Sequence, residues 1–248
     1  MATTIAISGK GGSGKTTLAA MIIRLLCGQA GNAVLAVDAD PNCCLGVTMG
    51  VEPAVTIAEI REKTIKKTPN NAGLDRVRSF QYDIQQAVTE AKGFDLLTMG
   101  RPEGPGCYCA ANHLLRKLLD ELSLAYEFVV IDNEAGMEHL SRRTTDSVEL
   151  LCIVAEATAL GAVTTARISE LAKQLPIAVK EIGVIWNKVD GKSNEPKLEE
   201  IETLGSVPFD QLIFDASMQG KTVFELEENS PAFLAVRKIF EQKLTVKS

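Results

Sequence analysis

"GKGGSGKTT", residues Gly9 to Thr17, is the most informative run of residues in the chain. It follows an apolar β-type run, "TTIAIS" (3–8), and opens a helical pattern at 15–28. Its spacing matches G-x-x-x-x-G-K-[ST], a phosphate-binding loop that needs a strand before it and a helix after it. A chance glycine-rich turn would not explain the strand, the helix and the Lys-Thr pair in one register. The stretch therefore predicts a nucleotide-binding loop, the P-loop.

The residue types in this loop suit phosphate chemistry. Glycines let the backbone turn tightly, so that successive N–H groups point at the phosphates, and the helix N-terminus adds a favourable potential. Lys15 would neutralise charge on the β- and γ-phosphates, and the Thr16 hydroxyl would ligate Mg²⁺. We therefore expect the nucleotide to contact Gly9, Lys10, Gly11, Gly12, Ser13, Gly14, Lys15, Thr16 and Thr17.

The rest of the chain alternates short apolar runs with amphipathic stretches, which is typical of βαβ units around a mostly parallel sheet. Strands are predicted at 3–8, 33–38, 94–99, 128–132, 150–156, 182–187 and 205–209. Helices are predicted at 15–28, 55–67, 80–91, 110–124, 160–175, 195–203 and 231–243. We expect an α/β fold, a P-loop NTPase with a mostly parallel sheet of seven to eight strands flanked by helices, in a single domain spanning 1–248.

Composition limits the classes of function. The net charge of −6 and the pI near 5.2 argue against non-specific nucleic-acid binding, which needs clustered basic residues. The first residues lack the pattern of a secretory signal, and no apolar run approaches the roughly 20 residues of a membrane-spanning helix. We therefore expect a cytoplasmic protein with no nucleic-acid or membrane partner. Its six cysteines are better explained as core residues or metal ligands than as disulfides.

Acidic residues end two of the predicted strands. "AVLAVDADPN" places Asp38 and Asp40 at the carboxyl end of its strand, and "FVVIDNEAG" ends another strand in Asp132. Ligands of open α/β sheets bind at this edge. Asp132 resembles the Walker-B aspartate that holds Mg²⁺, and Asp38 would hold Mg²⁺ through water. Each aspartate alone is also explained as a helix cap or turn residue.

Lys10, a second lysine early in the P-loop, resembles the signature of the deviant Walker-A ATPases. That class contains the chromosome-partitioning and division-site ATPases and the nitrogenase iron protein. The resemblance implies that Lys10 reaches across a dimer to the partner's nucleotide, and that Asp40 orients or activates the attacking water. Lys10, Lys15 and Asp40 are thus the predicted catalytic residues. From its charge alone, Lys10 could equally be a solvated loop lysine.

The short motif near residue 187 does not decide whether the bound base is guanine or adenine. "NKVD", Asn187 to Asp190, fits the guanine-specificity pattern N-K-x-D. Asn187 could instead make a bidentate contact with the adenine edge, a pairing that Asn favours. In the deviant Walker-A ATPases, which this chain resembles at Lys10, an Asn occurs at this place. In the same class, a loop like Pro208-Phe209-Asp210 lies against the base. The resemblance therefore favours ATP, with these residues as nucleotide contacts.

Cys107 and Cys109 form the chain's one Cys-x-Cys pair, in "GRPEGPGCYC". Two thiolates suit Zn²⁺, Ni²⁺, Cu⁺ or an iron–sulfur cluster, but they cannot complete a four-coordinate site. A two-fold dimer would supply the missing pair, because it presents the same patch twice. The alternative is a pair of ordinary reduced cysteines in a loop.

The combination of "GKGGSGKT", "DADPN", "CYC" and "DNEAGMEHLSRRT" closely resembles the nickel-maturation ATPases of carbon monoxide dehydrogenase and acetyl-CoA synthase, the CooC/AcsF group. The resemblance covers roughly residues 9–210. It implies an ATP- and Mg²⁺-dependent metallochaperone whose Cys107 and Cys109 bind Ni²⁺ or Zn²⁺ between the two chains of a homodimer. Its client would be carbon monoxide dehydrogenase or acetyl-CoA synthase.

Two other functions compete with this one. An iron–sulfur reductase-like ATPase would place its cluster at Cys107, but "DNEAGMEHLSRRT" lacks the second cluster cysteine of the nitrogenase iron protein. A partitioning or division-site positioning ATPase would use the tail "PAFLAVRKIFEQKL" on DNA or membrane, because Phe233, Val236, Phe240 and Leu244 share a helical face. Such a face more often docks on the sheet.

Overall fold

The computed structural model describes residues 2–29, 31, 33–66, 86–101, 115–116, 119, 122–134, 147–175, 177–191 and 195–245. Its strands are β1 (Thr3–Gly9), β2 (Val34–Asp38), β3 (Val88–Ala91), β4 (Phe94–Thr98), β5 (Phe128–Asp132), β6 (Ser147–Glu156), β7 (Ala178–Val189) and β8 (Glu202–Pro208). Its helices are α1 (Lys15–Cys27), α2 (Cys44–Met49), α3 (Ile57–Lys66), α7 (Ala159–Gln174), α8 (Gln211–Met218) and α9 (Pro231–Thr245), with short 3₁₀ turns η1 (Ser123–Ala125) and η2 (Val223–Glu225).

The strands form one sheet in the order β3-β4-β2-β5-β1-β6-β7-β8. All neighbouring strands are parallel except β3 and β4, which pair antiparallel. The strand that leads into the P-loop lies inside the sheet, between β5 and β6. The predicted α/β fold with a mostly parallel sheet is therefore confirmed, at the upper of the two predicted strand numbers.

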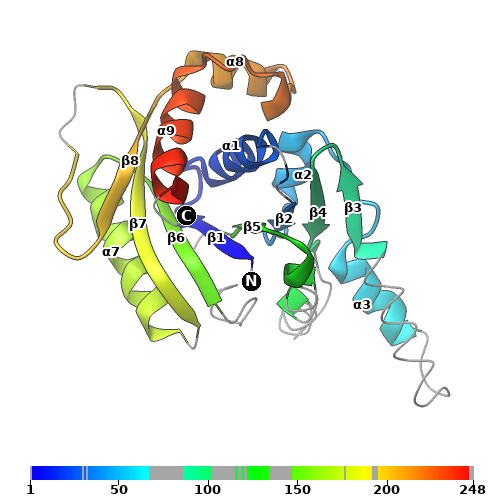
Figure 1. Cartoon of the computed structure of the whole chain (residues 1–248). Helices are drawn as coiled ribbons and strands as arrows, with labels where there is room; N and C mark the ends of the chain where they lie inside the picture. Colours follow the sequence, from blue (N-terminus) through cyan, green and yellow to red (C-terminus); the bar gives the residue numbers. More distant parts are fainter. Residues whose placement is uncertain are drawn as a thin grey trace.

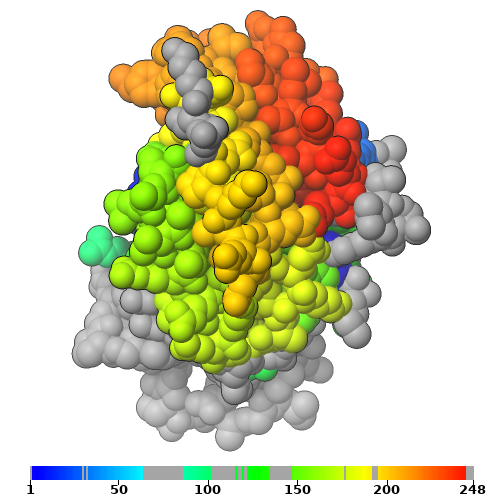
Figure 2. Space-filling model, turned by 90° about the vertical axis from the view of Figure 1, so that its left-hand side faces the viewer, coloured from blue at the N-terminus to red at the C-terminus, as the bar shows by residue number. Residues whose placement is uncertain are grey.

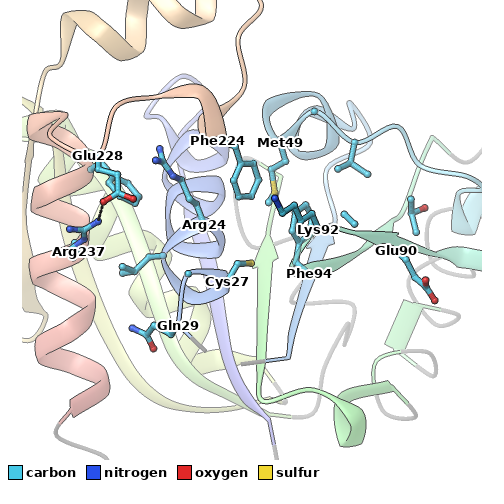
Figure 3. A pocket seen from close by; sticks show the side chains of 18 of the residues that line it. Arg24, Cys27, Gln29, Met49, Glu90, Lys92, Phe94, Phe224, Glu228 and Arg237 are labelled. Atoms are coloured by element: carbon cyan, nitrogen blue, oxygen red, sulfur yellow. Dashed lines mark hydrogen bonds and ion pairs between the residues drawn. The ribbon is translucent and has the colours of Figure 1, made fainter. Parts of the chain in front are cut away.

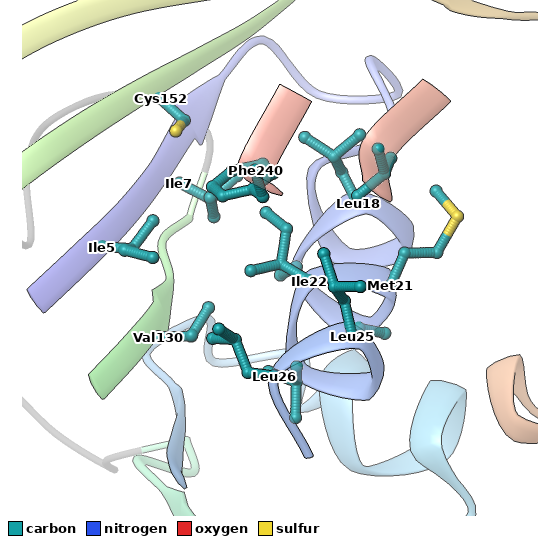
Figure 4. Packing of buried hydrophobic residues seen from close by; sticks show 14 of the residues in the cluster. Ile5, Ile7, Leu18, Met21, Ile22, Leu25, Leu26, Val130, Cys152 and Phe240 are labelled. Atoms are coloured by element: carbon teal, nitrogen blue, oxygen red, sulfur yellow. The ribbon is translucent and has the colours of Figure 1, made fainter. Parts of the chain in front are cut away.

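Helices cover both faces of the sheet (Figure 1). Successive side chains of a strand point to opposite faces. Ile5 and Ile7 of β1 accordingly pack with α1 and α9, whereas Ala6 between them packs with α7. Helix α1 is buried along most of its length, because α9 covers the side that the sheet leaves open (Figure 4). The P-loop helix is thus held firmly in the centre of the molecule.

The C-terminal helix is part of the core. Phe233, Val236 and Phe240 of α9 are buried, and the helix packs against α1 and β8. Strands β7 and β8 lie between α7 on one side and α9 on the other (Figure 2). The expected docking of this helix is confirmed for these three residues. In the part of the chain that the structure describes, no helix combines the length and the apolar character needed to cross a membrane.

Two helix predictions were wrong. The helix at 80–91 is contradicted at its end, where Val88 to Ala91 form β3 and pair with β4 across a turn at Gly93, which has a φ of +91°. The helix at 195–203 is contradicted because Glu202 and Thr203 begin β8 and pair with β7. In both cases hydrogen bonding to a neighbouring strand overrides a local helical pattern.

Candidate nucleotide-binding site

The predicted site residues meet at the carboxyl edge of the sheet. Strand β1 runs into the P-loop, β2 and β5 end at Asp38 and Asp132, and β7 carries Asn187 near its end. The register places Asp38 directly beside Asp132, and Asp132 beside Ile7 of β1. The fold therefore brings the P-loop and both strand-end carboxylates together, as the strand ends predicted.

The backbone carbonyls of the P-loop are held by donors of the protein. The Lys10 carbonyl accepts from the Ser13 N–H (3.2 Å) and lies 3.4 Å from the Lys15 ammonium. The Ser13 carbonyl accepts from the Asn187 side-chain amide at 2.8 Å, and the Gly14 carbonyl begins α1 by accepting from Leu18. Since these carbonyls face protein donors, N–H groups of the loop are left to face an anion.

Gly14 has to be glycine. Its φ of +94° is left-handed, and a Cβ at this position would lie 2.4 Å from the Asn187 side-chain nitrogen. The close approach of Asn187 to the loop therefore requires both the Asn187 side chain and a glycine at position 14. Ser13 next to it has a buried hydroxyl with no hydrogen-bond partner, which suits contact with a phosphate oxygen.

The two strand-end carboxylates are fully buried and repel one another. Burial, reinforced by the charge of Asp132, raises the pKa of Asp38 to about 7, although the N–H groups of Leu45 and Asp40 lower it. Burial also raises the pKa of Asp132 to about 6, although nearby Thr16 and Lys15 lower it. Two such groups on adjacent strands are costly unless a cation shares them.

The donor set fits Mg²⁺. Both carboxylate oxygens of Asp132 are buried and have no partner in hydrogen-bonding geometry, and Thr16 lies near enough to influence the pKa of Asp132. Mg²⁺ is commonly held by one or two carboxylates together with phosphate oxygens and water. Asp132 and Thr16 would hold the ion directly. Asp38 is less available, because its oxygens already accept from Asp40 (3.2 Å) and Leu45 (2.9 Å).

The loop after β2 is tied to the same edge. The Asp40 carboxylate accepts from the Asn42 backbone (2.9 Å) and side chain (2.8 Å). Cys43 adopts a left-handed φ of +53°, and α2 begins at Cys44. Asp40 thus lies in a turn that the Asp38 carboxylate holds, because this carboxylate accepts from the N–H groups of Asp40 and Leu45. The structure places Asp40 one residue from the buried edge and partly exposed, where water can reach it.

The residues predicted to contact the base have structural partners of their own. Asn187 is buried and bonded to the P-loop. Phe209 is 52% exposed and follows Pro208, the last residue of β8. The Asp210 carboxylate caps α8 through Leu212 (2.9 Å) and also accepts from Ser230 (2.6 Å) and Ala232 (3.1 Å) at the start of α9. Their contact with a base stays a prediction.

One residue that contacts the P-loop was missed by the sequence reasoning. The Lys188 ammonium donates to the Gly12 carbonyl at 2.7 Å, next to the Asn187 contact. The motif "NKVD" contains this lysine, but the motif predicts a contact with the base and none with the P-loop. A further missed residue is Asn133, whose side chain donates to the Ile7 carbonyl at 2.9 Å and fixes β5 against β1.

A cavity of about 1250 Å³ lies away from this site, between the C-terminal half of α1, the β3–β4 hairpin, η2 and α9 (Figure 3). Phe94 stacks on Phe224 at 5.8 Å, and Arg24 lies 4.4 Å above Phe233. None of the predicted nucleotide residues lines it. A smaller cavity of about 140 Å³ includes Thr17 of the P-loop and residues of α2 and α8, so it adjoins the phosphate helix.

Cys107 and Cys109 lie outside the described residues, between 101 and 115. Among the residues that are described, no cluster of three or more His, Cys, Asp or Glu side chains could hold a metal ion. Cys27 and Cys152 lie in α1 and β6, where Cys152 is buried, as expected of core cysteines. The metal prediction therefore rests on the sequence.

The comparisons with known proteins agree with this geometry. Residues 4–223 match the family model described as CobQ/CobB/MinD/ParA nucleotide binding domain. An uncharacterized ATP-binding protein of Methanocaldococcus jannaschii is 39% identical over 98% of this chain and 99% of its own. The carbon monoxide dehydrogenase accessory protein CooC of Rhodospirillum rubrum is 35% identical over 92% of this chain and 90% of its own.

Solved structures agree on the fold. The MinD chain in the MinC:MinD cell division protein complex of Aquifex aeolicus superposes with a TM-score of 0.73, at 20% identity over 98% of this chain and 96% of that one. The cell division ATPase MinD of Pyrococcus furiosus superposes with a TM-score of 0.70, at 22% identity over 99% and 100%. At these identities the likeness concerns the fold alone.

Proposed function

Because the chain belongs to the CobQ/CobB/MinD/ParA nucleotide-binding domain family and is a P-loop ATPase, we propose that it serves nickel-enzyme maturation. In this proposal it binds nickel through Cys107 and Cys109 and assists nickel insertion into carbon monoxide dehydrogenase or acetyl-CoA synthase. The observation that carries the proposal is the presence of this Cys-x-Cys pair in a chain so similar to a carbon monoxide dehydrogenase accessory protein.

The metal is cargo, and its chemistry explains why each chain holds only half a site. Thiolates are soft ligands that bind Ni²⁺ and Zn²⁺ well. Cys107 and Cys109 of one chain supply two of the four ligands of a closed site. An isologous dimer supplies the same pair again about its two-fold axis. One metal ion per two chains is the stoichiometry that follows.

The nucleotide site provides the energy. Lys15 and the P-loop N–H groups bind the phosphates, and Asp40 orients the attacking water. Bound between Thr16 and Asp132, Mg²⁺ would neutralise phosphate charge. Lys10 is exposed at the mouth of the loop, where it can reach a second chain. ATP would therefore hold two chains together, and its hydrolysis would release them.

The described residues that precede the thiols in the sequence are tied to the nucleotide site. The Met99 N–H donates to the Asp38 carbonyl at 2.8 Å, and Cys107 follows Met99 by eight residues in the sequence. The same Asp38 holds the loop of Asp40 through Leu45. A change in that loop would thus act on the segment that carries the thiols, which is a physical path for coupling ATP to the metal.

The test is nickel binding by equilibrium dialysis with metal analysis. The double variant C107S/C109S should lose stoichiometric nickel and retain Mg²⁺-dependent ATP hydrolysis in the absence of nickel. The matched control is C43S/C44S, because those adjacent thiols are partly exposed but have pKa values raised by burial and by Asp38. Undiminished nickel binding by C107S/C109S would refute the assignment. A brown, iron-containing protein after anaerobic purification would favour the reductase-like alternative.

The positioning-ATPase alternative has less support in this chain. Its best feature was the apolar face of the tail helix, and Phe233, Val236 and Phe240 on that face are buried in the core. Two of the three basic residues of the helix are engaged as well: Arg237 pairs with Glu228 at 3.4 Å, and Lys243 pairs with Glu181 and Glu202. The apolar face is therefore occupied within the molecule.

A further inference from the structure

The tip of the P-loop lacks packing support. Gly11 and Gly12 are exposed, and a Cβ built on either one would meet no atom within 4 Å. Gly12 also has a left-handed φ of +80°. Two consecutive glycines without neighbours have many accessible backbone conformations, and ordering them when a nucleotide binds costs conformational entropy. Something other than packing has to hold this tip in its binding conformation.

Strand β7 supplies a contact that does so. Asn187 and Lys188 are consecutive, and they donate to the consecutive carbonyls of Ser13 (2.8 Å) and Gly12 (2.7 Å). The peptide between Gly12 and Ser13 is anchored at both ends, since its carbonyl accepts from Lys188 and its N–H donates to Lys10 (3.2 Å). A planar peptide held at both ends cannot rotate without breaking a bond.

The backbone of β7 is adapted to make this contact. Lys188 is left-handed, with a φ of +58°, and the pairing of β7 with β8 is irregular between Asn187 and Val189. Left-handed backbone is unfavourable for a residue with a long side chain. The irregularity lets two neighbouring side chains of one strand reach the same loop, although neighbours in a regular strand point to opposite faces.

We propose that Lys188 is a positioning residue that pre-organises the tip of the P-loop for the phosphates of the nucleotide. Its ion pair with Glu156 at 3.3 Å joins two side chains that are 41% and 52% exposed, so this pair contributes little by itself. The bond to Gly12 uses the same charged ammonium and is shorter, at 2.7 Å against 3.3 Å. The inference concerns nucleotide binding and does not depend on the nickel proposal.

The position of the contact predicts its kinetic signature. Lys188 acts on the loop before the reaction and touches no reacting atom, so its removal weakens the ground state and the transition state equally. We expect Lys188→Met to raise the dissociation constants of ADP and ATP about tenfold, which corresponds to ~1.4 kcal/mol. The KM for ATP should rise similarly and kcat should stay within about twofold. Lys188→Arg, which keeps a charged donor, should recover most of the affinity.

The experiment uses the full chain, with ADP binding measured by calorimetry, ATP hydrolysis by phosphate release, and inorganic tripolyphosphate as a competitor. Tripolyphosphate has no base, so its affinity should fall as much as that of ADP. The matched control is Lys180→Met. Lys180 lies on the same strand as Lys188, but it pairs with Glu149 at 3.0 Å and not with the P-loop. Glu156→Gln should change the ADP affinity by less than about twofold.

Several results would overturn the proposal. Lys188→Met could bind ADP as tightly as the natural chain, or it could lose thermal stability without losing affinity, which would show a merely structural role. A loss of ADP affinity with tripolyphosphate binding intact would place Lys188 at the base instead. A fall in kcat at constant KM would show that Lys188 acts on the chemical step and not on the binding of the nucleotide.

Discussion

Among the single residues of the site, the most unfavourable electrostatic feature is a pair of buried carboxylates that a bound Mg²⁺ would stabilise. Asp38 and Asp132 lie side by side on β2 and β5, both essentially inaccessible to solvent. Without a cation, burial disfavours the ionised form of each, and the charge of Asp132 disfavours ionised Asp38 further. An Mg²⁺ ion bound with a nucleotide would offset the cost.

Replacement of one carboxylate should therefore separate stability from activity. Asp132→Asn removes a buried charge but keeps the size of the side chain. At pH 8, without nucleotide or Mg²⁺, we expect the free energy of unfolding to rise by about 1–3 kcal/mol, as judged from the raised pKa of Asp132. ATP hydrolysis should fall at least about a hundredfold. Urea unfolding and phosphate release measure the two effects, and a destabilised variant would contradict this explanation.

At the scale of elements, one carboxylate organises two helices. Asp210 caps the N-terminus of α8 and receives hydrogen bonds from Ser230 and Ala232 at the start of α9. Burial alone would raise the pKa of Asp210, but these hydrogen bonds outweigh it and hold the pKa below its ordinary value. The loop predicted to lie against the base is thereby fixed to the helix that covers α1.

Asp210→Asn tests this role through its pH dependence. The amide cannot accept every bond that the carboxylate accepts, so we expect a loss of about 1–2 kcal/mol of unfolding free energy at pH 7. A group with a lowered folded pKa stabilises above its unfolded pKa and loses that effect as the pH falls through the folded value. The difference between the natural chain and the variant should therefore shrink below about pH 4.

The control for Asp210 is Asp215→Asn in α8. The Asp215 carboxylate accepts an exposed hydrogen bond from the Gln211 side chain at 2.8 Å, within the same helix. Thermal or urea unfolding at several pH values would measure both variants. Equal and pH-independent losses for the two variants would exclude a special role for Asp210.

The elements that the sequence predicted well are those with a strong, long apolar pattern. The parallel strands and α1, α3, α7 and α9 were predicted to within a few residues at most ends, because buried strands are almost continuously apolar. Helix α8 was missed because it is short and follows turn residues. Strand β3 was missed because "VTEA" is too short to show a period, and only pairing with β4 makes it a strand.

At the scale of the whole molecule, the site could be predicted because parallel strands end at one edge. The positions of the P-loop, Asp38 and Asp132 followed from that rule and the motifs, and the prediction of an ATPase is confirmed by the family and the ATP-binding relatives. Contacts between distant segments could not be predicted. The motif "NKVD" draws attention to Lys188 but not to its partner Gly12, and the bridge from Asp210 to α9 leaves no local pattern in the sequence.

We propose that each chain carries half of a metal site and that ATP brings the halves together. Size-exclusion chromatography with light scattering and metal analysis, run with and without ATP and nickel, tests it most directly. With Mg²⁺, ATP and nickel, we expect a dimer that contains one nickel ion per two chains, and C107S/C109S should dimerise with ATP but contain no stoichiometric nickel. Nickel bound one per chain in a monomer, unchanged by ATP, would contradict the account.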